Sequence, residues 1–292
     1  MSAPARPAAT PAAAPAGFLR RALGHRSFVI GGTLTGMLIL AAVVSLFWTP
    51  HSAYDISVVN RLKGPSATHW LGTDQFGRDI LSMLMVGAQN SIAVGVVAVG
   101  IGLFVGVALG AVASARRGWL EEAVMRVSDF TFAFPAILSA IMITAILGPG
   151  AINSILAIGI YNIPIFARLT RGTANAIWAR EFVLAARAAG KGRTRITIEH
   201  VLPNVVNIIV VQATIQFAIA ILAEAALSYL GLGTQPPNPS WGRMLSEAQA
   251  LIYMAPELAI YPGLTIVLAV LGLNLLGDGL RDLIDPRLAR KR

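Results

Sequence analysis

The stretch ILSMLMVGAQNSIAVGVVAVGIGLFVGVALGAVASA, residues 80–115, carries no charged side chain along its whole length. A membrane-spanning helix needs about 20 largely apolar residues to cross a hydrocarbon core roughly 30 Å thick. Within lipid, backbone N–H and C=O groups must bond to one another inside the segment, and a helix achieves this. The stretch therefore predicts a transmembrane helix over residues 90–113, with the apolar run 80–86 lying along the membrane interface before it.

Four other stretches are free of charged residues, namely 27–54, 131–167, 201–223 and 258–277. Residues 131–167 are long enough for two spans, which Gly148-Pro149-Gly150 would separate. The composition agrees, because 55% of the chain is hydrophobic and 13% is charged, whereas soluble domains are about a quarter charged. We therefore expect an all-α integral membrane protein with six transmembrane helices, near residues 27–48, 90–113, 124–147, 152–170, 206–229 and 258–277.

The basic residues predict how the chain is oriented. If the N-terminus is cytoplasmic, only four of the 23 Lys and Arg residues lie in external segments: Arg61, Lys63, Arg78 and Arg243. Loops rich in Lys and Arg stay on the cytoplasmic side, so we expect both termini there. The expected organisation, in chain order, is a disordered Ala/Pro-rich tail (1–26), a first span with an external segment (27–89), a core with a cytoplasmic loop at 171–204 (90–287), and a basic tail (288–292).

Several function classes are disfavoured by the sequence. The net charge of +9 does not indicate nucleic-acid binding, because the basic residues flank the expected spans, where topology and anionic headgroups account for them. The absence of Cys excludes disulfides, thiolate catalysis and Cys-ligated metal. The chain also lacks the phosphate-cradling pattern G-x-x-x-x-G-K-[ST]. We predict no catalytic residue, no metal site and no cofactor in this chain.

The loop at 171–204 has a helical pattern of its own. Small or apolar residues recur at i, i+3, i+4 and i+7, which predicts one apolar helical face: Phe182, Ala185, Ala186 and Ala189. Gly190 follows where glycine permits the left-handed turn that ends a helix. A second short helix over 193–200 should end before Pro203, since proline disfavours helix in the residue before it. Such a face suits docking of another protein or packing on the chain's own bundle.

Few polar side chains lie inside the expected spans. Glu224 is the one carboxylate clearly within a span, and a charge at the bilayer centre costs about 2.5–3.5 kcal/mol on insertion scales. It either faces the pathway or another subunit, or has a structural role near the outer end of its span. Asn162 and Asn274 are milder cases, suited to hydrogen bonds between helices or to pathway contact. His200 stands alone, so we expect a structural or docking role and not a metal ligand.

Glycines repeat every four residues in two expected spans: Gly102, Gly106 and Gly110 in the second, and Gly32 and Gly36 in the first. Small residues at this spacing allow two helices to approach closely. The neighbouring helix belongs either to the same bundle or to a second subunit.

The cytoplasmic loop resembles a known motif. Leu184-Ala185-Ala186-Arg187-Ala188-Ala189-Gly190, followed nine residues later by His200-Val201-Leu202-Pro203, is similar to the "EAA" loop of binding-protein-dependent ABC permeases. The spacing from Gly190 to Pro203 matches that family, whereas Leu184 stands where its pattern has Glu. The resemblance implies a loop that docks on an ATPase through six residues: Leu184, Ala185, Ala186, Gly190, His200 and Pro203.

Other stretches narrow the resemblance to one subfamily. HWLGTDQFGRD (69–79), LSYLGLG (227–233) with PSWG (239–242), and NLLGDGLRD (274–282) with DPR (285–287) resemble the second permease subunit of dipeptide, oligopeptide and nickel importers. Together they extend over most of the chain, from residue 69 to residue 287.

The resemblance implies a type I ABC importer fold in the bacterial inner membrane. This chain would form half of the pathway beside a second homologous permease, with two cytoplasmic ATPases that bind ATP and Mg²⁺ and an external solute-binding protein. Asp74, Arg78 and Asp79 would either pair with one another or contact that binding protein. The expected cargo is a di- or oligopeptide or a glutathione-like tripeptide. A nickel chelate or another small solute is the alternative, followed by an ATP-independent secondary transporter or channel.

Overall fold

The computed structural model describes residues 18–284, which fold into helices joined by short loops and one long irregular segment. No strand forms within these residues, where only an isolated bridge joins Thr73 and Asp79. The helices are α1 (Phe18–Leu23), α2 (Arg26–Ser45), η1 (Val58–Asn60), α3 (Ile80–Arg116), α4 (Trp119–Phe132), α5 (Ala136–Leu147), α6 (Ala151–Trp178), α7 (Glu181–Ala188), α8 (Arg193–Ile196), η2 (Thr197–Val201), α9 (Leu202–Tyr229), α10 (Trp241–Ala248), η3 (Gln249–Leu251) and α11 (Glu257–Ile284).

The expected membrane-spanning class is confirmed. Five helical segments are long and apolar enough to cross a membrane: α2, α3, α6, the continuous run from α8 through η2 to α9, and α11. A sixth span forms only if α4 and α5 are counted together, and these two helices meet at 89°. The span expected near 124–147 is therefore not one continuous helix but two helices at a sharp angle. Pro135 lies at the break, where its ring disfavours helix in the preceding residue.

Helix α3 begins ten residues before the expected start of its span. The run 80–86, which we placed along the interface, forms its first turns. With 37 residues, α3 is about 55 Å long at 1.5 Å per residue. That exceeds a hydrocarbon core of about 30 Å, so α3 must extend into the aqueous phase.

The glycine repeat of α3 packs against α6 within the same chain. A Cβ added at Gly102 would overlap Asn162, one at Gly106 would overlap the backbone of Ile163, and one at Gly110 that of Ala167. Bundle packing is thus the correct alternative for this repeat. The repeat in α2 differs, because a Cβ at Gly32 or Gly36 would meet nothing within 4 Å. Close approach of α2 to α11 instead uses Gly31 and Gly272.

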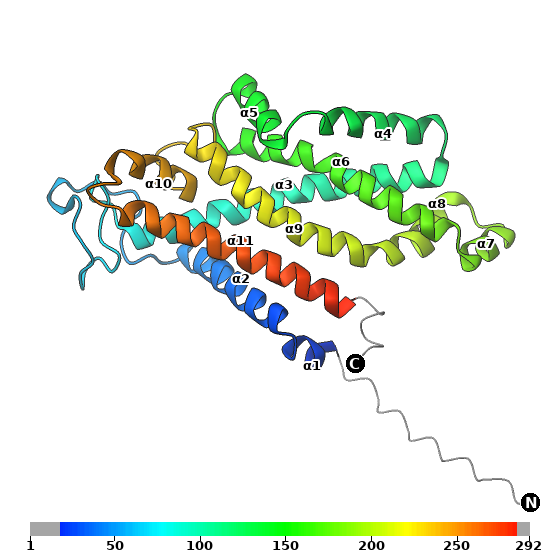
Figure 1. The fold of residues 1–292 in the computed structure, drawn as a ribbon, viewed down its shortest axis with the longest axis horizontal. Helices are drawn as coiled ribbons and strands as arrows, with labels where there is room; N and C mark the ends of the chain where they lie inside the picture. The colour runs from blue at the N-terminus through cyan, green and yellow to red at the C-terminus, as the bar shows by residue number, and fades with distance from the viewer. Residues whose placement is uncertain (1–17, 285–292) are drawn as a thin grey trace, which may run out of the picture.

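Figure 1 shows an elongated bundle with different structures at its two ends. The segment 46–79 and α10 lie at one end, whereas α7 and α8 lie at the other. α1 and the end of α11 point toward the end that carries α7. This arrangement leaves α7 as a projection beyond the long helices.

The structure differs from the sequence-based expectation near the N-terminus. The predicted disordered tail, 1–26, is too long, because residues 18–23 form α1 and Ala22 is buried, 1% exposed. α1 packs against α2 and α11, which explains its order. Residues 1–17, the tail 288–292 and the motif at 285–287 lie outside the described residues.

Candidate functional site

Helix α7 ends in a glycine-dependent stop, as its sequence predicts. Gly190 has φ +81°, in the left-handed region. The N–H of Lys191 donates to the carbonyl of Ala186 at 3.1 Å, and the N–H of Gly190 donates to that of Arg187 at 3.0 Å. These two bonds form a Schellman motif. A Cβ at Gly190 would meet nothing within 4 Å, so glycine is required here by backbone conformation and not by crowding.

Helix α7 is held by one buried side chain and exposes most of the others. Val183 is 1% exposed and belongs to the same buried cluster as Ile196 and Val201. Its two neighbours, which flank Val183 on the helix, are exposed: Phe182 by 46% and Leu184 by 53%. Of the remaining residues of the expected face, Ala185 and Ala189 are exposed and Ala186 is half-buried. The helix is anchored to the bundle yet presents an apolar surface that no described residue covers.

The second arm of the loop differs from the expected short helix. α8, the π-helical turn η2 and α9 run on without interruption, so the helix does not end before Pro203. Pro203 is in the first turn of α9, directly after the wide turn. Proline in a continuous helix lacks the N–H bond and crowds the carbonyl four residues before it, and here the wider π-helical turn stands directly before Pro203. The loop therefore leads rigidly into a membrane-spanning helix.

A polar cluster joins the turn after α7 to η2. Glu199 accepts hydrogen bonds from the Lys191 Nζ and the Arg195 Nε, both at 2.6 Å. His200 lies 3.2 Å from the Lys191 Nζ, and its ring packs edge-on to Phe182 with centroids 6.3 Å apart. His200 is therefore placed beside the α7 surface, together with Leu184, Ala185, Ala186 and Gly190, whereas Pro203 lies farther along, inside α9.

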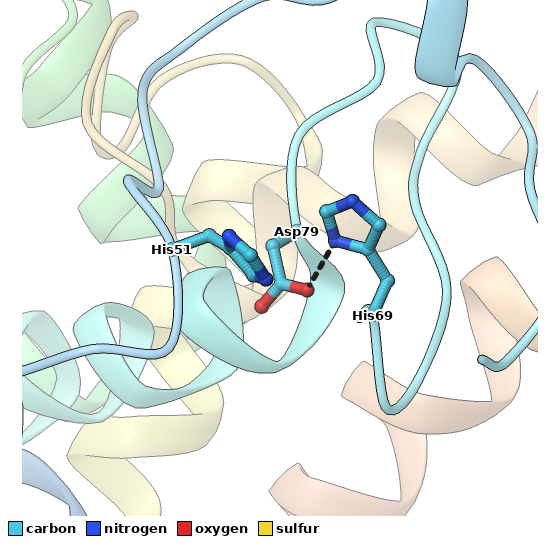
Figure 2. Close-up of side chains that lie close together, drawn as sticks. All are labelled: His51, His69 and Asp79. Carbon is cyan, nitrogen blue, oxygen red and sulfur yellow. Dashed lines mark hydrogen bonds and ion pairs between the residues drawn. The ribbon is translucent and has the colours of Figure 1, made fainter. Parts of the chain in front are cut away.

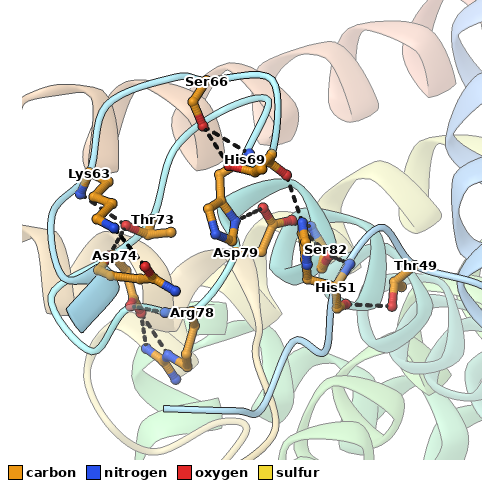
Figure 3. A network of polar contacts seen from close by, with 12 residues as sticks. Thr49, His51, Lys63, Ser66, His69, Thr73, Asp74, Arg78, Asp79 and Ser82 are labelled. Atoms are coloured by element: carbon orange, nitrogen blue, oxygen red, sulfur yellow. Dashed lines mark hydrogen bonds and ion pairs between the residues drawn. The ribbon is translucent and has the colours of Figure 1, made fainter. Parts of the chain in front are cut away.

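At the opposite end, Asp74 and Arg78 pair with each other (Figure 3). The Arg78 Nε donates to the Asp74 Oδ2 at 2.6 Å, while the other Asp74 oxygen accepts the backbone N–H groups of Phe76 and Arg78, both at 2.8 Å. A second Arg78 nitrogen donates to Glu247 of α10 at 2.6 Å. Asp74 is 5% exposed, so these charges tie the irregular segment to α10.

Asp79 is the N-cap of α3 and also contacts His69 (Figure 2). Its Oδ2 accepts from the Ser82 N–H at 2.9 Å and the Ser82 hydroxyl at 2.7 Å, and its Oδ1 lies 3.0 Å from the His69 Nδ1. His51 packs on His69 with ring centroids 4.4 Å apart, and its Nε2 lies 2.6 Å from the Thr68 carbonyl. These contacts join three segments of chain that are distant in sequence.

The sequence does not predict the cluster of His51, His69 and Asp79, because the three residues are widely spaced and follow no metal-ligand pattern. Their potential ligand atoms lie within 4.8 Å of one another, and imidazole with carboxylate is a set that transition metals accept. Both Asp79 oxygens and one nitrogen of each ring already have protein partners. These hydrogen bonds account for the cluster as a structural one.

Glu224 lies under the loop after α9. It is 0% exposed, and its Oε1 accepts from the Ser228 hydroxyl at 2.6 Å and the Thr234 hydroxyl at 3.2 Å. Ser228 also accepts the Thr234 N–H at 2.9 Å. The buried carboxyl group thus links the last turns of α9 to the segment that follows it.

The three polar residues grouped from the sequence lie in separate surroundings. Asn162, from α6, lines an open cavity of about 470 Å³ between α5, α6 and α9, together with Tyr161 and Gln216. Glu224 does not line this cavity, and Asn274 is exposed on α11. Gln216 was missed because an isolated Gln in an apolar run gives no spacing signal. Its Oε1 is buried without a hydrogen-bond partner among the described residues.

Comparison with known proteins identifies the family. Residues 98–290 match the family described as "Binding-protein-dependent transport system inner membrane component". The chain belongs to this family. The expected ABC permease resemblance, including the transport function and the inner-membrane location, is confirmed. The alternatives of an ATP-independent transporter or channel are not supported.

Similar relatives are permeases of peptide transport systems. The chain is 45% identical to the dipeptide transport system permease protein DppC of Alkalihalophilus pseudofirmus over 89% of this chain and 86% of the relative. It is 42% identical to the glutathione transport system permease protein GsiD of Pectobacterium atrosepticum, over 93% and 90%. Identity to GsiD of an Escherichia coli strain is 46%, over 86% and 84%. This binding-protein-dependent permease is therefore a multi-pass component of a transport complex.

Proposed function

We propose that this permease forms half of the translocation pathway of an ABC importer for dipeptides or glutathione-like tripeptides. Its pathway is completed by a second, homologous permease, and an external binding protein delivers the cargo. ATP and Mg²⁺ are bound by two ATPase subunits on the cytoplasmic side. The names of the relatives support the peptide class. Both chain termini are cytoplasmic in this arrangement.

The exposed apolar surface of α7 is the main support for ATPase docking. It projects at one end of the bundle (Figure 1), presents Phe182, Leu184 and Ala185, and is anchored through Val183. An ATPase that closes around α7 pushes on a helix whose following arm is continuous with α9. Movement of the ATPases is thereby transmitted to a membrane-spanning helix without a flexible joint between α8 and α9.

The cavity lined by Asn162 and Gln216 is the pathway segment that this chain contributes. Amide groups suit a peptide backbone, because each offers both a hydrogen-bond donor and an acceptor. The Gln216 Oε1 is buried without a hydrogen-bond partner among the described residues, so the side chain has to turn toward the cavity to make such a contact. The cavity is otherwise apolar, with Ile137, Ile158 and Leu222 in its wall.

The stop at Gly190 provides the test. Gly190→Val places a β-branched residue at φ +81° and should abolish ATP-dependent uptake and release the ATPases. Gly190→Asn is the matched control, since Asn tolerates the left-handed region and nothing crowds the position. We expect the Asn variant to retain at least about half of the uptake. Normal ATPase recruitment and uptake by a membrane-inserted Val variant would refute docking through this turn.

A further inference from the structure

A groove of about 700 Å³ lies where α3 ends and α4 begins, beside α8 and η2. Small and branched apolar side chains form one wall: Ala108, Ala111, Val112, Ile198 and Leu202. Ile198 is 61% exposed and Val112 is 42% exposed, so described residues leave this wall open. The groove lies at the end of α3 that directly follows the expected span 90–113, which is the level at which lipid headgroups are expected.

Three arginines surround the groove. Arg116 and Arg117 end α3, Arg193 begins α8, and all three are exposed. No carboxylate lines the groove, and none of the three forms an ion pair with another residue of the range 18–284. Arg126, Arg168, Arg171 and Arg195, at the same end of the bundle, each pair with a carboxylate. The groove therefore concentrates uncompensated positive charge.

The backbone fixes the spacing of these arginines. Arg117 has φ +52° and Gly118 φ +70°, which turns the chain sharply from α3 into α4. The Arg193 Nη1 donates to the Arg116 carbonyl at 3.4 Å and so holds the start of α8 against the end of α3. Trp119, 79% exposed, stands at the same rim, and exposed Trp is typical of the membrane–water boundary.

We infer that this groove binds an anionic phospholipid, with the phosphate at Arg116, Arg117 and Arg193 and an acyl chain along the apolar wall. Basic pockets between spans at the cytoplasmic boundary recognise anionic headgroups in this way. A free phosphate leaves the apolar wall uncovered, and an acidic protein surface leaves the exposed Trp119 and Ile198 without an apolar contact. The inference goes beyond peptide transport and requires only the membrane location of the chain.

The test is native mass spectrometry of the complete chain in detergent, titrated with phosphatidylglycerol or with phosphatidylcholine of the same acyl chains. Retention should favour phosphatidylglycerol, and Arg116→Gln/Arg117→Gln or Arg193→Gln should weaken it about fivefold for each arginine removed. Arg126→Gln/Arg281→Gln removes two exposed charges outside the groove and should change retention less than twofold. Matching circular dichroism spectra show that each variant is folded.

Three results would overturn the inference. One is equal retention of the two lipids, or unchanged phosphatidylglycerol binding in the groove variants. Another is displacement of phosphatidylglycerol by millimolar inorganic phosphate, which would make this a phosphate site without lipid selectivity. The third is loss of ATPase co-purification in groove variants that still bind the lipid, which would assign the arginines to a subunit contact. Loss of uptake in the α7 variants alone would bear on the proposed function and not on this groove.

Discussion

At the scale of single residues, two positions show how local chemistry sets the geometry of the ends. Asp79 starts α3 by accepting the Ser82 N–H, and its side chain is 2% exposed. Gly190 ends α7 by adopting a left-handed conformation. The role of Gly190 could be predicted, because helix stops have a recognisable residue preference. The N-cap role of Asp79 has a comparable signal, an Asp directly before an apolar run, whereas its contact with His69, ten residues away in an irregular segment, could not be predicted.

Replacement of Asp79 tests the cap and the cluster together. Asp79→Ala should lower the free energy of unfolding by about 2–3 kcal/mol, because it removes an N-cap worth about 1 kcal/mol and leaves the buried Ser82 hydroxyl and N–H without an acceptor. Thermal unfolding of the purified chain in detergent measures this change. Asp55→Ala is the control, because Asp55 is exposed and its carboxylate has no hydrogen bond among the described residues. It should change stability by less than about 0.5 kcal/mol. Equal melting curves for the two variants would show that the Asp79 contacts do not stabilise the fold.

At the scale of helices, the packing of α3 on α6 depends on positions without a side chain. Gly106 faces the backbone of Ile163, whereas Gly100, in the same helix, has nothing within 4 Å of an added Cβ. The four-residue spacing predicts close packing of α3 against another helix. It does not say which helix that is, and the structure shows that it is α6.

A matched pair of substitutions separates packing from helix propensity. Gly100→Ala should be neutral or stabilising by up to about 1 kcal/mol, because Ala is the better helix former. Gly106→Ala should have the opposite sign and cost about 1–3 kcal/mol, since the methyl group forces α3 away from α6. Thermal unfolding in the same detergent gives both values. The same sign for both substitutions would contradict the α3–α6 contact.

The boundaries of helices were harder to predict than their existence. Hydropathy located every span region, because about 20 apolar residues have no other stable place than a membrane. It did not show the break at Pro135, because the expected span 124–147 joined the end of the amphipathic α4, with Arg126 and Asp129, to the uncharged α5. Nor did it show that α8, η2 and α9 form one continuous helix. Pro203 suggested a helix end there, whereas in the structure the helix continues through it after a π-helical turn.

At the scale of the whole molecule, the two ends of the bundle differ in whether their polar and apolar side chains are engaged within the chain or exposed. At one end, partly buried ion pairs join Arg78 to Asp74 and to Glu247, and so hold the irregular segment on α10. At the other end, α7 exposes an apolar surface, and three arginines line a groove. The sequence predicted the second end better, because the loop has a helical period and a glycine stop. Buried charge pairs between distant segments leave no periodic trace in a sequence.

Docking of α7 on an ATPase can be tested by site-specific photo-crosslinking. The chain has no Cys, so Ala185→Cys gives a single attachment site for a maleimide–benzophenone probe on the exposed side of α7. In the assembled transporter we expect a crosslink between this position and an ATPase subunit, with a yield that changes on addition of ATP. Val59→Cys, 83% exposed at the opposite end, should give no ATPase adduct. An active complex in which Ala185→Cys never crosslinks to an ATPase, or does so no more than Val59→Cys, would show that α7 is not the docking element.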